Sequence, residues 1–259
     1  MTALARMSKT LFDRHGFYQA KGFVAHKELQ SLRDVVQEFH QKWQLDNAEF
    51  CANRAINSSK LTGMQYPNAQ QRLCLFEFLG SAALMAQVHE VFGGSAMFMG
   101  TQLFFNPVNP QQRNYWHRDR QYHMTLEQQQ EALTGPEVVH FRITLYDEPG
   151  IEVVPGSHRN WDNKEQLGVR LERNGHSNSD ALSTAIRIEL EAGDLLIFSA
   201  STLHRGIYGG ERLALDVLFC DPVEELADFI DVQTLPSDSI VQIMQDPSAF
   251  ESAIALSAQ

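Results

Sequence analysis

The sequence predicts a mainly β fold, a sandwich or a jelly roll, with helices before and after it. From residue 96 onward, short apolar stretches follow the two-residue period of β-strands. Turn signals such as Pro149-Gly150 and Gly209-Gly210 separate several of these stretches. Few helical patterns lie between them, which disfavours the strand and helix units of a parallel sheet. The predicted strands span residues 96–106, 114–118, 138–147, 151–154, 186–190, 194–200 and 213–220.

The part of the chain before residue 96 is predicted to be mostly helical. Residues 16–24 contain two Gly-Phe steps and predict a short strand, which leads into an amphipathic helix over residues 26–45. The apolar residues of that helix recur at the spacing of one helix face, and they are Leu29, Leu32, Val35, Val36 and Phe39. A second helix is predicted over residues 82–92, where Gly93-Gly94 ends it.

No repeat, low-complexity block or linker divides the chain, so we predict a single domain over residues 1–259. It comprises an N-terminal helical part (about 1–95), a jelly-roll core (about 96–220) and a C-terminal tail (221–259). Within the core, residues 160–185 are polar and poorly periodic, as lids and binding loops often are. The tail has helical patterns and is expected to cover the core or to form a dimer contact.

The charge balance limits the possible partners. The net charge is −11, from 32 acidic and 21 basic residues, and no cluster of Lys and Arg occurs. A polyanion requires a basic surface to neutralise its phosphates. We therefore expect neither nucleic acid nor a membrane surface as a partner. The oligomeric state stays open, and a homo-oligomer is possible.

The cysteines and the N-terminal residues indicate the compartment. Cys51, Cys74 and Cys220 are scattered and lack the paired spacing of a disulfide framework or a zinc site. The first twenty residues have no apolar segment of the signal-peptide type, and no apolar run reaches the roughly 18 residues of a membrane span. These observations predict a cytoplasmic protein with reduced thiols.

Two imidazoles and one carboxylate are the residues most indicative of chemistry. His117 and Asp119 are two positions apart, so on a strand they point to the same face. His204 follows an apolar strand far along the chain, where it can supply a third ligand. Two His and one carboxylate form the facial triad that binds non-haem Fe(II) and leaves positions open for a co-substrate and O2. A His-x-Asp triplet alone is common in a chain with ten His, and the setting of His204 favours the metal site.

Two other motif interpretations fail. His117-Arg118-Asp119 also spells the catalytic-loop triplet of protein kinases, but Met124 stands where that loop requires Asn. Neither a Gly-rich nucleotide loop nor a P-loop is present in the sequence. The spare imidazoles His123 and His140 are interpreted as hydrogen-bonded structural residues and stay outside the triad.

Four motifs in order resemble one known family. The opening residues FDRHGFYQAKGFVAHKELQSLRD come first, then Trp116-His-Arg-Asp119, then Val153-Val-Pro-Gly-Ser-His158, then Gly193-Asp194 through His204 to Arg212. Together, over roughly residues 10–220, they resemble the phytanoyl-CoA dioxygenase family of Fe(II)/2-oxoglutarate oxygenases. That resemblance implies a double-stranded β-helix, the jelly-roll core of cupin-like proteins, with flanking helices.

The resemblance also implies roles for individual residues. His117, Asp119 and His204 would bind Fe(II), and Arg212 would hold the distal carboxylate of 2-oxoglutarate through a two-pronged ion pair. Reaction with O2 would then hydroxylate or otherwise oxidise a small-molecule substrate and release succinate and CO2. Further candidates for co-substrate contacts are Tyr115, Gln102 and Thr101, and candidates for substrate contacts are Arg142 and Asn106.

Departures from the family pattern leave some alternatives open. Arg212 lies only eight positions after His204, and Arg205 is a rival for the co-substrate, although a neighbour of a ligand usually points away. His158 is expected to fix a turn at the cavity rim, and Asp194 to shape the turn before the last metal strand. A halogenase would need the carboxylate ligand vacated, which Asp119 opposes. The alternative from another class is a catalytically silent jelly roll that binds a small molecule.

Overall fold

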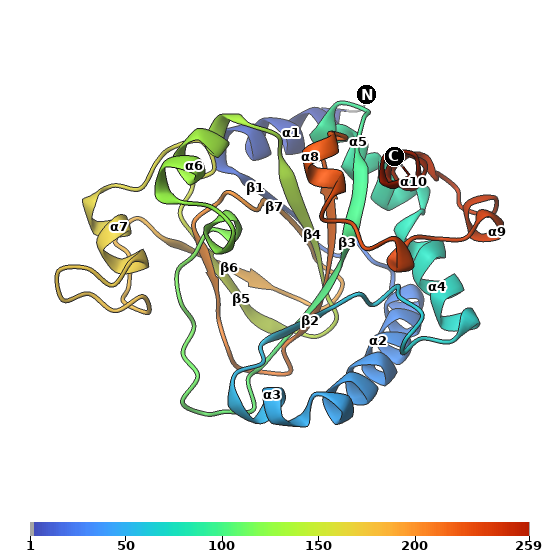
Figure 1. Ribbon diagram of the computed structural model, residues 1–259, viewed down its shortest axis with the longest axis horizontal. Helices are drawn as coiled ribbons and strands as arrows, with labels where there is room; N and C mark the ends of the chain where they lie inside the picture. The colour runs from blue at the N-terminus through green and yellow to red at the C-terminus, as the bar shows by residue number, and fades with distance from the viewer. Residues whose placement is uncertain (1–2, 259) are drawn as a thin grey trace.

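The computed structural model describes residues 3–258, so residues 1, 2 and 259 of the predicted domain lie outside the described part. Two antiparallel sheets form the centre of the molecule (Figure 1). The larger sheet has the order β1 (Phe17–Ala20), β7 (Leu195–Ser199), β4 (Val138–Thr144), β9 (Leu213–Cys220), β3 (Met97–Phe105) and β2 (Asn57–Ser59). The smaller sheet has the order β6 (Ile186–Leu190), β5 (Glu148–Val153) and β8 (His204–Gly206).

Helices surround these sheets, and several of them cover the outer face of the larger sheet (Figure 1). They are α1 (Ala3–His15), α2 (His26–Asp46), α3 (Ala48–Asn53), α4 (Ala69–Leu79), α5 (Ala82–Phe92), α6 (Leu126–Glu131), α7 (Lys164–Arg170), α8 (Glu224–Ala227), α9 (Asp238–Val241) and α10 (Ser248–Ser257). Three short 3-10 helices span Asp119–Tyr122, Ala132–Thr134 and Val232–Thr234. Among residues 3–258, no helix is both long and apolar enough to cross a membrane.

The two faces of the larger sheet have different surroundings. Phe141 and Ile143 of β4 belong to the apolar core that the helices cover, whereas His140 and Arg142 line an internal cavity. Strand β9 repeats this alternation, with Val217 in the core and its neighbours on the cavity side. Successive side chains of a strand point to opposite faces. The cavity therefore has a polar and charged wall built from the same strands that form the core.

A bulge in β5 sets the direction of one buried carboxylate. Glu148 pairs with Leu190 and Ile151 pairs with Ile188, so β5 has one more residue than its partner between these pairs. Gly150 lies in the bulge with φ +85°, and a Cβ built there would be 1.8 Å from the carbonyl oxygen of Ile188. Only glycine fits this close approach. As a result, Glu148 is buried and reaches the arginines of the cavity wall.

The predicted fold class is confirmed, since the molecule consists mainly of antiparallel sheets with flanking helices. The helix over 82–92 and the strand over 186–190 have the predicted bounds. The predicted strand over 114–118 is wrong, because only His117 forms an isolated bridge there. Segment 160–185 is not entirely irregular, since α7 begins after Asn163, which caps it together with Gln166.

Candidate metal centre

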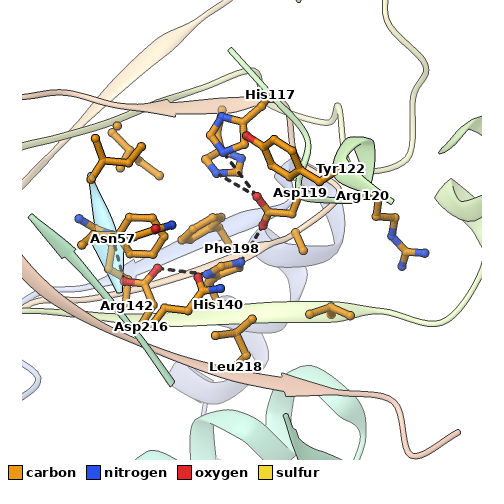
Figure 2. A pocket seen from close by; sticks show the side chains of 18 of the residues that line it. Asn57, His117, Asp119, Arg120, Tyr122, His140, Arg142, Phe198, Asp216 and Leu218 are labelled. Carbon is orange, nitrogen blue, oxygen red and sulfur yellow. Dashed lines mark hydrogen bonds and ion pairs between the residues drawn. The ribbon is translucent and has the colours of Figure 1, made fainter. Parts of the chain in front are cut away.

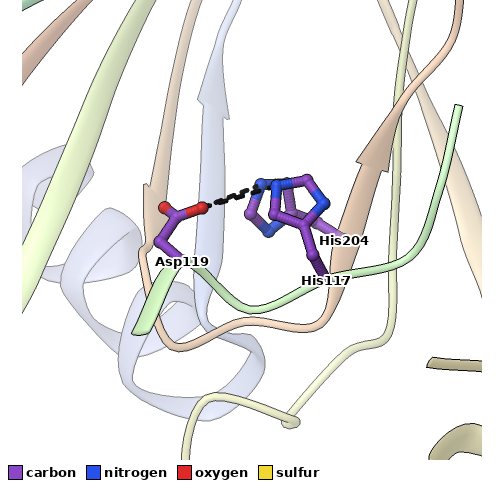
Figure 3. A group of neighbouring side chains, drawn as sticks. All are labelled: His117, Asp119 and His204. Atoms are coloured by element: carbon purple, nitrogen blue, oxygen red, sulfur yellow. Dashed lines mark ion pairs between the residues drawn. The ribbon is translucent and has the colours of Figure 1, made fainter. Parts of the chain in front are cut away.

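The ligand atoms of His117, Asp119 and His204 converge on one point, although they come from separate parts of the chain (Figure 3). These atoms all lie within 4.8 Å of one another. Oδ1 of Asp119 is 3.4 Å from Nε2 of His117 and 3.8 Å from Nε2 of His204. The two imidazole centroids are 4.3 Å apart. Two imidazoles and one carboxylate on one side of a point can occupy one face of an octahedral cation.

Backbone pairing places the three side chains. His117 and His204 form an antiparallel bridge in which each amide donates to the other's carbonyl oxygen at 3.0 Å. His204 begins β8, and its partner lies on the loop after β3. Asp119 begins a 3-10 helix, and its amide donates to the carbonyl oxygen of Ala200 at 3.1 Å. The three ligands therefore rest on hydrogen-bonded backbone from two distant segments.

Both imidazoles are oriented by carbonyl groups. Nδ1 of His117 is 3.1 Å from the carbonyl oxygen of Tyr115, and Nδ1 of His204 is 2.9 Å from that of Thr202. A carbonyl oxygen only accepts hydrogen bonds, so each Nδ1 carries the hydrogen. Nε2 of each ring is then the nitrogen available to a metal, and it is the one that faces Asp119.

The surroundings favour the protonation states of metal ligands. Burial would raise the pKa of the Asp119 carboxyl group, but its contacts with the imidazoles of His117 and His140 outweigh burial and hold this pKa well below its usual value. Burial, reinforced by the neighbouring imidazole of His117, lowers the pKa of His204 to about 3. A carboxylate and a neutral imidazole are the forms that coordinate cations. The residues present therefore fit a divalent metal.

The three ligands open into a cavity of about 700 Å³. Its wall combines the charged strand residues with an apolar part formed by Met99, Leu218, Leu226 and Phe229. The last two belong to the C-terminal tail, so this tail closes part of the cavity. Figure 2 shows Asp119, His140, Asp216 and Arg142 following one another along the wall.

Arg212 lies in the same cavity with unused hydrogen-bonding capacity. Its Nη1 donates to the carbonyl oxygen of Phe105 at 3.2 Å, and its Nε has no hydrogen-bond partner among the described residues. Oε2 of Glu148 lies 3.6 Å from Nε of Arg212. Gly206 leaves room for the guanidinium, because a Cβ there would be 2.4 Å from Nη2. Burial lowers the pKa of Arg212 to about 10, so the group remains a cation at neutral pH.

A family model described as phytanoyl-CoA dioxygenase (PhyH) matches residues 12–207, which is more than half of the chain. The chain belongs to the phytanoyl-CoA dioxygenase family. The resemblance inferred from the sequence motifs is thereby confirmed. Among curated proteins, no sequence matches this chain.

Crystal structures of similar fold come from three bacterial proteins. AviO1 from Streptomyces viridochromogenes Tue57 is 18% identical, with a TM-score of 0.60 over 86% of this chain and 97% of that chain. HygX from Streptomyces hygroscopicus, with nickel and 2-oxoglutarate bound, is 16% identical, with a TM-score of 0.60 over 84% and 87%. EctD from S. alaskensis, with 2-oxoglutarate and 5-hydroxyectoine, is 16% identical, with a TM-score of 0.55 over 85% and 76%. At these identities the likeness concerns the fold.

The three residues that we expected to contact the co-substrate do not all lie in the cavity. Gln102 and Tyr115 line the cavity, and the Tyr115 hydroxyl lies 2.8 Å from that of Tyr122 at the cavity mouth. Thr101 does not line the cavity, because its Oγ1 accepts a hydrogen bond from the amide of Leu61 at 3.0 Å. Neighbouring strand residues face opposite sides, so Gln102 and Thr101 cannot share one ligand. Of these two residues, Gln102 lies on the cavity side.

The two residues predicted to contact the substrate lie in different surroundings. Arg142 does line the cavity, but its guanidinium is 2.9 Å from Glu148 and 3.0 Å from Asp216, so these carboxylates already neutralise it. Asn106 lies outside the cavity lining. Its side chain binds the backbone of Gly209 and Gly210, 2.9 Å to each, and so shapes the loop before Arg212.

Arg205 and Asp194 lie as expected, whereas His158 does not line the cavity. Arg205 points away from the cavity, where it pairs with Glu152 and packs on the ring of Trp116 at 4.7 Å. Asp194 shapes its turn by accepting hydrogen bonds from the amides of Gly22 and Glu191. His158 is buried beside α1 and is not one of the three convergent ligands.

Sequence reasoning placed His140 outside the triad as a hydrogen-bonded residue, but it did not single out Asp216 or Glu148. His140 contacts Asp119 directly, and Asp216 and Glu148 lie behind it. Burial would lower the pKa of His140, but its contacts with Asp119 and Asp216 outweigh burial and raise this pKa to about 9. The signal in the sequence was a run of charged residues at alternate positions in apolar strands, such as His140 and Arg142.

Proposed function

We propose that this protein is a non-haem Fe(II)/2-oxoglutarate-dependent dioxygenase that hydroxylates or otherwise oxidises a small molecule and releases succinate and CO2. The observation that carries the proposal is the convergence of His117, Asp119 and His204 in a cavity that also contains the under-bonded Arg212. Membership of the phytanoyl-CoA dioxygenase family supports it. So do the structures of HygX with nickel and 2-oxoglutarate bound and of EctD with 2-oxoglutarate and 5-hydroxyectoine.

Each residue has a definite task in this proposal. His117, Asp119 and His204 hold Fe(II), which supplies the activation of O2 when it is bound together with 2-oxoglutarate. Arg212 donates two parallel hydrogen bonds to the distal carboxylate of the co-substrate, as a guanidinium fork does. Gln102 and Tyr115 are placed to contact it from the wall. The enclosing strands keep bulk water from these polar groups.

The small-molecule substrate occupies the part of the cavity that the co-substrate leaves free. Met99 and Leu218 come from the sheet, and Leu226 and Phe229 come from the tail. These side chains favour an apolar portion of the substrate, since burying apolar surface contributes about 25 cal/mol per Å². The substrate's reactive carbon must lie on the open side of the triad, opposite the ligands.

The proposal is tested by measuring succinate release with Fe(II), 2-oxoglutarate and O2 over a set of small molecules. We expect His117→Ala, Asp119→Ala and His204→Ala to lose succinate formation, because each removes one metal ligand. His176→Ala, which alters an exposed imidazole, is the matched control and should leave activity unchanged. Normal turnover in any of the three ligand variants would contradict the proposal.

Arg212 provides a second arm of the same test. We expect Arg212→Lys to raise the KM for 2-oxoglutarate by roughly 10-fold or more, since a lysine cannot form the paired hydrogen bonds of a guanidinium. The kcat at saturating 2-oxoglutarate should change less. An unchanged KM in this variant would assign the co-substrate carboxylate to another residue.

A further inference from the structure

We propose that His140 is the positioning residue for the metal-binding carboxylate, and that a buried row of alternating charges holds His140 in place. The row consists of Asp119, His140, Asp216, Arg142 and Glu148. The inference deepens the proposed function and rests on it, because it concerns how the metal site is shaped. Its central contact can be followed in Figure 2, where His140 lies between Asp119 and Asp216.

The two oxygens of Asp119 have separate partners. Oδ1 faces the imidazoles of His117 and His204, at 3.4 and 3.8 Å. Oδ2 is 2.8 Å from Nε2 of His140. A hydrogen bond to Oδ2 holds the carboxylate plane and leaves Oδ1 as the oxygen that a cation meets. Groups that orient a metal ligand in this way contribute strongly to metal affinity.

The ring of His140 is also held by an aromatic neighbour. It stacks on Phe198 with centroids 4.5 Å apart and planes 14° from parallel. The same Phe198 packs edge-on against the metal-ligand candidate His204, with centroids 5.1 Å apart. One aromatic ring therefore separates the positioning imidazole from a ligand imidazole and sets the spacing between them.

The remaining members of the row anchor the far nitrogen of His140. Nδ1 is 3.1 Å from Oδ2 of Asp216, and Oδ1 of Asp216 is 3.0 Å from Nη1 of Arg142. Glu148 then accepts from Arg142 at 2.9 and 3.2 Å. All four residues are buried, with exposed fractions of 0 to 6%. Because each charge has an opposite neighbour and little access to water, movement of one member leaves a buried charge unpaired.

Two conservative variants separate the proposed contact from general packing. In His140→Gln the side-chain amide can reach the place of Nε2 and still donate to Asp119. In His140→Asn the shorter amide takes the place of Nδ1, so it reaches Asp216 only. Both variants lose the aromatic ring. A difference between them therefore reports the hydrogen bond to Asp119, and not the loss of stacking on Phe198.

The experiment is an anaerobic titration of the metal-free full chain with Co(II), followed by the visible absorption of the bound ion. We expect His140→Asn to bind Co(II) at least 10-fold more weakly than the wild type, the lower end of the effect of removing an orienting partner. His140→Gln should stay within about threefold, because its donor is retained. His158→Asn, a change at a buried imidazole outside the row, should bind like the wild type.

The outcomes decide between the possibilities. Equal Co(II) affinity of His140→Asn and the wild type would overturn the positioning role, and so would equal losses in the Asn and Gln variants. If neither variant folds, Asp216→Asn decides, because it weakens the anchor without touching the metal-binding carboxylate. Weaker Co(II) binding by Asp216→Asn supports the proposal, and unchanged binding contradicts it. Failure of the wild type to bind Co(II) would count against the proposed function itself.

Discussion

Arg118, which lies between the metal-ligand candidates His117 and Asp119, points away from them. Arg118 is 1% exposed, and its guanidinium donates to Asp162, with Nη2 at 2.6 Å and Nε at 3.1 Å. It also donates to the carbonyl oxygens of Ser157 and Ser201. Asp162 is in turn paired with Arg170 of α7. Arg118 thus ties the metal-binding loop to two other loops and a helix.

Removing this guanidinium should destabilise the fold. We expect Arg118→Met to lower the free energy of unfolding by about 3 to 5 kcal/mol, since breaking a buried ion pair leaves its partner charge without compensation. Urea denaturation measures the effect. Arg173→Met, at an exposed position of the same charge, is the control and should change stability by less than about 0.5 kcal/mol. A loss below about 1 kcal/mol for Arg118→Met would show that the buried contacts of Arg118 do not stabilise the fold.

A buried histidine makes the stability depend on pH. Burial lowers the pKa of His158 to about 4, against an ordinary value of 6.5. Between these two values the unfolded chain binds the proton and the folded chain does not, so stability is present above pH 6.5 and is lost as the pH falls toward 4. At about 1.4 kcal/mol per pKa unit, the loss amounts to roughly 3 kcal/mol.

His158→Asn should therefore flatten the acid side of the stability profile, as measured by urea denaturation from pH 7 to about 4. The variant loses stability at neutral pH through altered packing, but it should lose less than the wild type on acidification. Parallel profiles of the two proteins would contradict a neutral, buried His158.

At the scale of elements, the β5 bulge is a backbone feature on which the charged wall depends. It needs glycine at position 150, both for its φ of +85° and for the closeness of the Ile188 carbonyl oxygen. Gly175 is a matched control, since its φ is +83° but a Cβ there meets nothing within 4 Å. Both positions carry the cost of a positive φ, and only Gly150 carries the steric clash as well.

Gly150→Ala should consequently be the more harmful of the two substitutions. We expect Gly175→Ala to cost about 1 kcal/mol of unfolding free energy, and Gly150→Ala at least about 2 kcal/mol more, because the clash is with backbone. Thermal or urea denaturation of the pair measures the difference. Equal losses would mean that β5 can move away from β6 without cost.

Elements with a clear period could be predicted from the sequence, whereas face and register could not. The helix over 82–92 had an apolar face and a Gly-Gly end, and it is present as predicted. In β3, however, a register shift between Phe98 and Gly100 changes which residues face the cavity. After that shift, Thr101 lies toward Leu61 and Gln102 lies in the cavity. A bulge is set by pairing with another strand, and the local pattern does not contain it.

At the scale of the whole molecule, the metal-ligand candidates and the family could be predicted from the sequence, because each motif is a short run of neighbouring residues. The row of side chains behind Asp119 could not be predicted, because it joins residues of β4, β5 and β9 across the space between the two sheets. A lone His or Arg in an apolar strand has many explanations, and only the fold shows which carboxylates it meets. The same reasoning applies to Arg142, whose ion pairs with Glu148 and Asp216 are visible only in the fold.

Ligand binding should stabilise the folded chain as a whole. We expect Co(II) at 100 times its dissociation constant to add about 2.7 kcal/mol to the free energy of unfolding. For a chain of this size that corresponds to a rise in Tm of roughly 5 to 10 °C, measured by thermal denaturation. A chelator should reverse the rise, and Asp119→Ala should not show it. A rise of the same size in Asp119→Ala would place the ion elsewhere.

The most direct measurement of the central claim is an anaerobic titration of the metal-free protein with Fe(II) and 2-oxoglutarate, followed by visible absorption. The account predicts a weak charge-transfer band that requires both additions, since the co-substrate must chelate an ion held by His117, Asp119 and His204. The band should be absent in Asp119→Ala. A wild-type protein without this band, or a variant that retains it, would contradict the assignment of the iron and 2-oxoglutarate to this site.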